Sequence, residues 1–187
     1  DGSMDERLVN LRSSKNAKAR IKVLKGHFAT QNAHINTYLD MSTIKSRQNN
    51  ARETASVLAA EYENIPVSTI VCLDGMEVIG TFLAYELATT GGMNINKGAN
   101  ISIVSPEIDE IGQMVFRDNK QRMIKDQQVL ILASSITTGK TIVRALEAVE
   151  YYGGDPCGVA SIFSAPTRIA GLEVKCIFTS RDLPDYR

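Results

Sequence analysis

Short apolar runs alternate with longer amphipathic stretches along most of the chain. The runs rich in β-branched residues predict strands, which lie at 67–73, 100–104, 128–132, 158–163 and 174–179. Apolar strands that alternate with helices are typical of a parallel sheet with helices on both faces. The pattern therefore predicts the α/β class, and the length of 187 residues fits one compact domain.

The amphipathic stretches predict three helices, each with an apolar residue at every third or fourth position. Glycine pairs at 91–92 and 153–154 end the second and the third helix, as expected for helix C-termini. The predicted buried faces are Ala51, Ala55, Leu58 and Tyr62 in the first helix, Ile79, Leu83 and Leu87 in the second, and Ile142, Leu146 and Val149 in the third.

Charge adds one local feature to this picture. Lys plus Arg and Asp plus Glu each total 21, so the net charge is zero and implies no general attraction to nucleic acid or to a membrane. Apolar runs stay well below the roughly 18 residues of a membrane span. The segment 4–25 differs, with seven basic residues against two acidic ones. We interpret it as a solvated helix face, with a nucleic-acid-binding arm as the alternative.

Cysteine and histidine offer few candidates for chemistry. The three cysteines are Cys72, Cys157 and Cys176. They form no CxxC pair, so we expect free thiols in a cytoplasmic protein. We interpret the initial DGSM as an expression remnant, and we expect no signal peptide. His27 and His34 have no third ligand in sight and are expected to pack rather than to bind a metal. A catalytic Cys–His pair stays open.

The stretch VLILASSITTGKT at 129–141 carries the clearest chemical signal. An apolar strand runs into a loop of small hydroxyl residues, and this loop opens an amphipathic helix. Such a loop can hold a phosphate, because backbone N–H groups and the helix dipole meet there. The predicted phosphate-binding residues are Ser135, Thr137, Thr138, Gly139, Lys140 and Thr141.

Two other interpretations of this stretch are open. The Walker A motif of P-loop proteins needs a glycine where Ser134 stands, and it normally follows an early strand. Alternatively, TTGKT at 137–141 is only a strand–helix turn with a good N-cap.

The stretch 128–141 resembles the PRPP-binding loop of type I phosphoribosyltransferases. In both, an apolar strand is followed by a pair of functional positions (133–134 here), two further residues and the pattern T-T-G-x-T. The stretch GHFATQNAHINTYLD at 26–40 is similar to the N-terminal hood of orotate phosphoribosyltransferases, and the order of elements matches from Gly26 to Phe163. The resemblance implies a type I phosphoribosyltransferase-like parallel sheet flanked by helices. It further implies a small N-terminal helix and hood segment at 4–45, a core at 46–187, and a homodimer with the hood at or beside its twofold contact.

The resemblance also implies functional positions, and this chain departs from several of them. The family loop carries two adjacent acids that hold ribose hydroxyls and organise magnesium, and Ala133 and Ser134 stand at these positions. Neither residue supplies the carboxylate that magnesium prefers. On the pyrophosphate side, Glu77 stands near the position of a family lysine, with Asp74 close by. Both carboxylates would repel pyrophosphate.

Two further functional positions of the family are altered. The stretch SPEIDEIG at 105–112 aligns with the basic mobile loop, but it carries no basic residue, and only Gly112 matches. The residues at the four basic positions are Ser105, Pro106, Asp109 and Ile111. Ala165 stands where the family has an arginine that binds the orotate carboxylate, and Arg168 follows three residues later.

These features predict an orotate-phosphoribosyltransferase-like protein that binds a phosphorylated ribose or nucleotide at the TTGKT loop. No residue is assigned a catalytic role, no cofactor is certain, and dependence on magnesium is not expected. One alternative is an active phosphoribosyltransferase of nucleotide metabolism, which joins a base to PRPP and releases pyrophosphate through an atypical site. A P-loop-type nucleotide-binding protein is the more remote alternative.

Overall fold

The computed structural model describes residues 41–182. The predicted hood at 26–40, both histidines and the basic segment 4–25 lie outside these residues, and so do residues 183–187. Within 41–182, every helix is too short or too polar to cross a bilayer.

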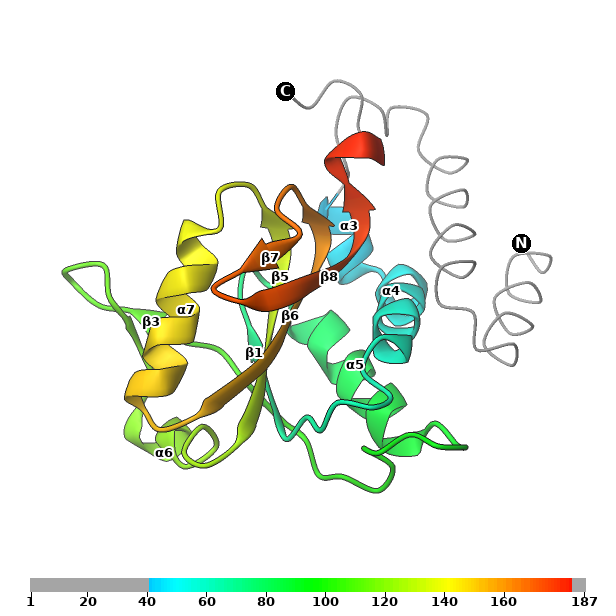
Figure 1. Cartoon of the computed structure of the whole chain (residues 1–187), viewed down its shortest axis with the longest axis horizontal. Helices are drawn as coiled ribbons and strands as arrows, with labels where there is room; N and C mark the ends of the chain where they lie inside the picture. Colours follow the sequence, from blue (N-terminus) through cyan, green and yellow to red (C-terminus); the bar gives the residue numbers. More distant parts are fainter. Residues whose placement is uncertain (1–40, 183–187) are drawn as a thin grey trace.

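A six-stranded sheet forms the centre of the molecule, with the strand order β2-β1-β5-β6-β8-β7 (Figure 1). All pairs are parallel except β7 with β8. The strands are β1 at Thr69–Cys72, β2 at Ser102–Val104, β5 at Gln128–Ile136, β6 at Asp155–Ser164, β7 at Arg168–Ile169 and β8 at Leu172–Thr179. The sheet and its helices confirm the predicted α/β class.

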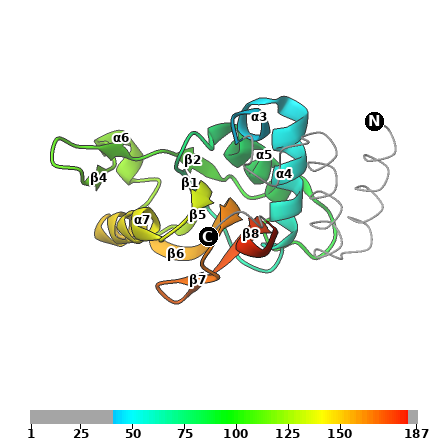
Figure 2. The same cartoon turned by 90° about the horizontal axis from the view of Figure 1, so that it is seen from above.

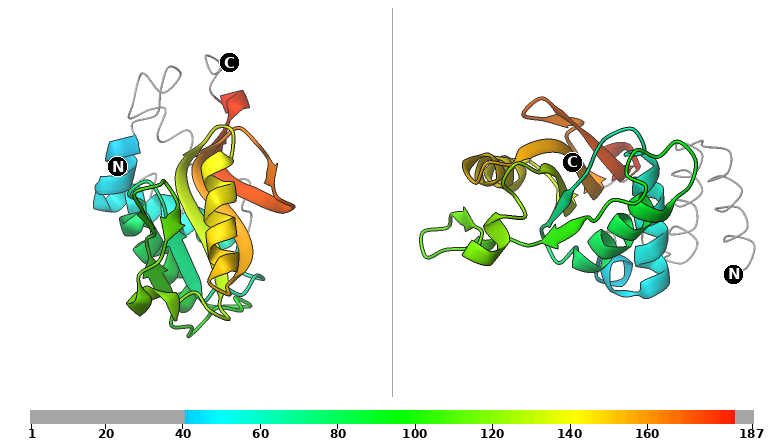
Figure 3. Two further views of the ribbon diagram at one scale, coloured as in Figure 1. Left: turned by 90° about the vertical axis from the view of Figure 1, so that its left-hand side faces the viewer. Right: turned by 90° about the horizontal axis from the view of Figure 1, so that it is seen from below.

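Helices cover both faces of the sheet, as Figure 2 and the right-hand view of Figure 3 show. One face carries α3 (Met41–Ser46), α4 (Gln48–Ala60) and α5 (Glu77–Thr89), and the other carries α7 (Lys140–Tyr151). Each face has its own apolar cluster. Every residue of the three predicted helix faces is at most 5% exposed, so their burial is confirmed, although Tyr62 lies two residues beyond the end of α4.

The shortest elements were not predicted, since a strand of two residues is too short to show a periodic pattern of apolar residues. They are the hairpin of β3 (Glu107–Ile108) and β4 (Met114–Val115), the edge strand β7, the helix α6 (Asp118–Gln121) and the 3-10 helix η1 (Ser180–Asp182). Strand β5 also extends four residues beyond the predicted end at 132.

The predicted glycine stop after α7 is a Schellman motif. Gly153 has a left-handed backbone with φ of 85° and donates its N–H to the Glu150 carbonyl at 3.0 Å. Gly154 donates to the Val149 carbonyl at 2.9 Å. The two bonds satisfy carbonyl groups that the helix end would otherwise leave without partners.

Buried Asn96 joins two connections between elements. Its amide donates to the carbonyls of Tyr62 at 3.1 Å and Ile65 at 2.9 Å, and its Oδ1 accepts from the Val67 N–H at 2.8 Å. The α5–β2 connection is thereby tied to the segment that leads from α4 into β1.

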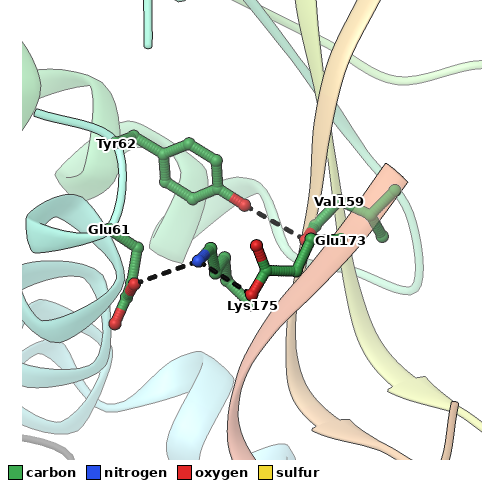
Figure 4. Close-up of polar contacts among 5 residues, drawn as sticks. All are labelled: Glu61, Tyr62, Val159, Glu173 and Lys175. Carbon is green, nitrogen blue, oxygen red and sulfur yellow. Dashed lines mark hydrogen bonds and ion pairs between the residues drawn. The ribbon is translucent and has the colours of Figure 1, made fainter. Parts of the chain in front are cut away.

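A second set of polar contacts joins the turn after α4 to strands β6 and β8 (Figure 4). The Tyr62 hydroxyl donates to the Val159 carbonyl at 3.1 Å, and Lys175 on β8 lies between Glu61 at 3.5 Å and Glu173 at 3.1 Å. Burial raises the pKa of Tyr62 well above its usual value, so the phenol keeps the proton that it donates.

Candidate functional site

The strand order places a topological switch point between β1 and β5, and we call the region outside these two strand ends the crevice. The chain leaves β1 through α5 toward β2 on one side, and it leaves β5 through α7 toward β6 on the other side. The loops that follow β1 and β5 therefore diverge to opposite faces at neighbouring strand ends (Figure 1). Ligands of open α/β sheets bind at such a switch point, outside the carboxyl ends of the strands. The predicted phosphate loop follows β5 at this point.

The end of β5 and the loop that leads from it into α7 present small polar side chains to solvent. Ser135, Thr137 and Thr138 are exposed, whereas Gly139 is buried and has a left-handed backbone with φ of 87°. A Cβ added at Gly139 would lie 3.2 Å from Ile169 Cδ1, which is tighter than ordinary packing. Glycine thus satisfies both the backbone angle and the close approach of β7.

The first turn of α7 opens toward this loop. Gly139 is the N-cap residue, so no side chain at that position caps the helix. The Lys140 N–H donates a long bond of 3.4 Å to Thr138 Oγ1, and the side chains of Lys140 and Thr141 are exposed. The N-terminus of a helix carries roughly half a positive charge and free N–H donors, which favour an anion.

The two positions that replace the family acids point to different surroundings. Ala133 is 1% exposed and packs in the apolar cluster beneath α7. Ser134 is 7% exposed, and its N–H and Oγ both lie 3.4 Å from Asp74 Oδ2. A carboxylate from the β1 turn therefore lies beside Ser134, one of the two positions at which the resemblance implies an acid.

The turn after β1 has an unusual backbone. Asp74 and Gly75 both have positive φ, at 56° and 72°. Lys45 on α3 donates from Nζ to the main-chain oxygen of Asp74 at 2.8 Å. Lys45 was not predicted as a site residue, because nothing in the local pattern of α3 shows that its side chain reaches a turn 29 residues away.

Glu77, the other acid of this region, contacts Ser105 and not Ser134. It is the first residue of α5, where a negative charge is favourable, and its Oε1 accepts from Ser105 Oγ at 3.1 Å. Asp74 thus contacts the β5 side of the crevice, and Glu77 contacts the residue that follows β2.

Asp109 in the predicted mobile-loop region holds a tight hairpin turn between β3 and β4. Its Oδ1 accepts from the N–H groups of Ile111 at 3.0 Å and Gln113 at 2.8 Å. Gly112 follows with φ of 85°, as in a hairpin turn closed by a left-handed glycine. At the base of the hairpin, Glu107 pairs with Arg117 at 2.7 Å. Glu107 and Asp109 therefore have structural contacts of their own.

Arg168 is engaged away from the crevice. Its Nη2 donates to the Gly171 carbonyl at 2.8 Å and so closes the β7–β8 turn. Ala165 donates its N–H to the Ile136 carbonyl at 2.9 Å, which holds the end of β6 beside β5. In this arrangement, Arg168 does not take the place of the arginine that Ala165 replaces.

The β5 side of the crevice does not fit a magnesium ion held by two adjacent carboxylates, and the carboxylate beside it is that of Asp74 on the β1 side. Ala133 offers no donor, Ser134 offers a hydroxyl, and residues 41–182 contain no group of three or more potential His, Cys, Asp or Glu ligands. Cys72 is no candidate nucleophile, because burial, with a smaller effect of the Glu77 charge, raises the pKa of its thiol to about 12.

Comparison with known proteins supports the predicted relationship, although no family model matches the sequence. The orotate phosphoribosyltransferase of Desulforamulus reducens is 26% identical over 154 residues, which are 82% of this chain and 74% of the relative. The orotate phosphoribosyltransferase of Caldanaerobacter subterraneus is 26% identical over 139 residues, which are 74% of this chain and 66% of the relative.

Solved structures agree on the fold. Orotate phosphoribosyltransferase of Mycobacterium tuberculosis in complex with PRPP has a TM-score of 0.57 at 16% identity, covering 91% of this chain and 92% of that one. Adenine phosphoribosyl transferase of Trypanosoma brucei has a TM-score of 0.54 at 16% identity, covering 79% and 72%. The fold is that of the type I phosphoribosyltransferases. In sequence, the chain is similar to orotate phosphoribosyltransferases.

Proposed function

We propose that the protein binds a phosphorylated ribose or nucleotide, with its phosphate monoester held by the loop at 135–141. The observation that carries this proposal is the left-handed Gly139 at the N-terminus of α7, next to the exposed hydroxyls of Thr137 and Thr138. The loop lies at the β1–β5 switch point, where the fold places ligands.

The charges at the loop favour the same ligand. The loop itself contains no acid, and Lys140 adds a positive charge beside the N-terminal end of the helix dipole. A phosphate monoester needs no metal to bind there, because backbone N–H groups, hydroxyls and an ammonium supply the donors.

One observation favours the second candidate function, an active phosphoribosyltransferase. Lys45 and Asp74 place an ammonium and a carboxylate at the β1 turn, although neither residue stands at a family position. In such an enzyme, Lys45 and Asp74 would supply charges in place of the family residues that this chain lacks. The binding function is the better supported of the two, since the 5′-phosphate loop is retained and the basic groups for pyrophosphate are not.

Calorimetric titration of ribose 5-phosphate without magnesium tests the proposed function. We expect binding that weakens with salt, and an affinity at least about tenfold lower in Thr138→Val/Lys140→Ala, which removes a hydroxyl and a charge from the loop. Thr89→Val/Lys97→Ala is the matched control, because it changes the same residue types at exposed positions near the other end of the sheet. Equal affinities in the wild type and the loop variant, or binding by neither, would leave TTGKT a simple turn.

A further inference from the structure

We propose that Asp74 is the specificity-determining residue of this site. Its carboxylate selects a phosphate monoester that presents a hydroxyl toward β1, and it disfavours a ligand that carries a second phosphate there. The inference rests on the proposed phosphate site at 135–141 and names the class of ligand, a sugar monophosphate.

Asp74 occupies the side of the crevice opposite the phosphate loop. It lies two residues beyond the end of β1, and its Oδ2 faces the N–H and Oγ of Ser134 on β5. Both contacts are long, at 3.4 Å, and Asp74 itself is exposed. The carboxylate is thus only weakly bound within the protein and remains accessible to a ligand.

The chemistry of this group decides what it binds. An ionised carboxylate only accepts hydrogen bonds, so the part of the ligand that meets it must donate. Sugar hydroxyls donate, whereas a phosphate repels the carboxylate. At a separation of a few ångströms in partly solvated surroundings, this repulsion weakens binding about fivefold or more.

Lys45 acts as the positioning residue for this carboxylate. Its ammonium donates to the main-chain oxygen of Asp74 at 2.8 Å and so supports a turn whose φ of 56° non-glycine residues rarely adopt. The same ammonium is the cation that a second phosphate would seek. If Lys45 only supports the Asp74 turn, the site should disfavour PRPP. If Lys45 instead binds the second phosphate, the site should favour PRPP, so the two roles can be told apart by experiment.

Binding of three probes to the wild type and Asp74→Gly separates these possibilities. The probes are ribose 5-phosphate, ethyl phosphate and PRPP, titrated by calorimetry without metal. In the wild type, ribose 5-phosphate should bind about tenfold more tightly than ethyl phosphate, which has the same charge and no hydroxyl. In Asp74→Gly, this preference should vanish and PRPP should bind about fivefold more tightly.

Two variants control for folding and for charge. Glycine accepts the left-handed backbone of Asp74 without strain, and Asp74→Asn keeps a neutral acceptor in a residue that tolerates the same backbone, so it should show an intermediate preference. Asp126→Gly is the matched control. Asp126 is also exposed with φ of 61°, but it precedes β5 at the other end of the strand.

The failures are distinguishable. If the wild type binds neither ribose 5-phosphate nor ethyl phosphate, the phosphate site itself is wrong, and the role of Asp74 falls with it. If both bind equally, or if Asp74→Gly keeps the preference, only the role of Asp74 is overturned. Tighter binding of PRPP than of ribose 5-phosphate by the wild type would also overturn it, in favour of a phosphate contact by Lys45.

Discussion

Purified protein supplied with orotate, PRPP and magnesium is expected to show no measurable orotate phosphoribosyl transfer. The reaction needs donors and a metal to neutralise the charge that develops on departing pyrophosphate, and removing a single such donor typically costs 10²–10³-fold in rate. In this chain Ala133 has no donor, Glu77 is an acid, and the hairpin at 107–115 has no basic residue. The combined loss should exceed about a thousandfold.

The assay should include the Desulforamulus reducens relative as a positive control under the same conditions. Turnover within tenfold of that enzyme would show that other residues replace the lost groups. Restoring acids is a less direct test, because Ala133→Asp would bury a carboxylate in the apolar cluster beneath α7 and destabilise the fold. Ser134→Asp avoids that cluster, but it places a second carboxylate beside Asp74.

Asn96→Ala should lower the free energy of unfolding by about 3 kcal/mol. The substitution removes three hydrogen bonds, at a cost of about 1 kcal/mol each, and of the three backbone groups only the Tyr62 carbonyl keeps another partner among the described residues, the Ile65 N–H at 3.2 Å. Asn96 is only 3% exposed, so water does not readily replace these bonds. Urea unfolding followed by circular dichroism measures the change.

The control for this prediction is Asn49→Ala on the exposed side of α4, which should change stability by no more than about 0.5 kcal/mol. Asn96→Asp is a second variant, because it keeps the acceptor for Val67 and replaces the donors with an oxygen that faces two carbonyls. A loss below about 1 kcal/mol in both Asn96 variants would contradict the structural role of this side chain.

The sheet and its main helices were predictable because their signals are local. Ile142, Leu146 and Val149 lie at helical spacing, and a glycine pair follows them, so one stretch of sequence defines a helix, its buried face and its end. The β3–β4 hairpin was not predicted, since two-residue strands carry no period. Its turn depends on Asp109 bonding to N–H groups of its own loop, a pattern that a comparison of charges alone overlooks.

Only the phosphate loop of the candidate site could be predicted from the sequence, whereas the contacts of Asp74 could not. The loop at 135–141 is contiguous, and its residue types predict an anion site wherever a strand meets a helix. The contacts of Asp74 are not contiguous, since Ser134 lies 60 residues and Lys45 29 residues away along the chain. These residues come together only because β1 pairs with β5 in parallel and because α3 lies beside the β1 turn. The periodicity of the sequence predicts neither the strand pairing nor the position of α3.

The most direct test of the phosphate site is to locate the bound ligand by NMR. Ribose 5-phosphate should be titrated into ¹⁵N-labelled protein without magnesium while the backbone amide shifts are followed. We expect the largest shifts on residues 135–142, with smaller ones at 74–76 across the crevice. Shifts centred instead on the exposed Arg47 and Arg52, or no shifts at millimolar ligand, would contradict the proposed phosphate site.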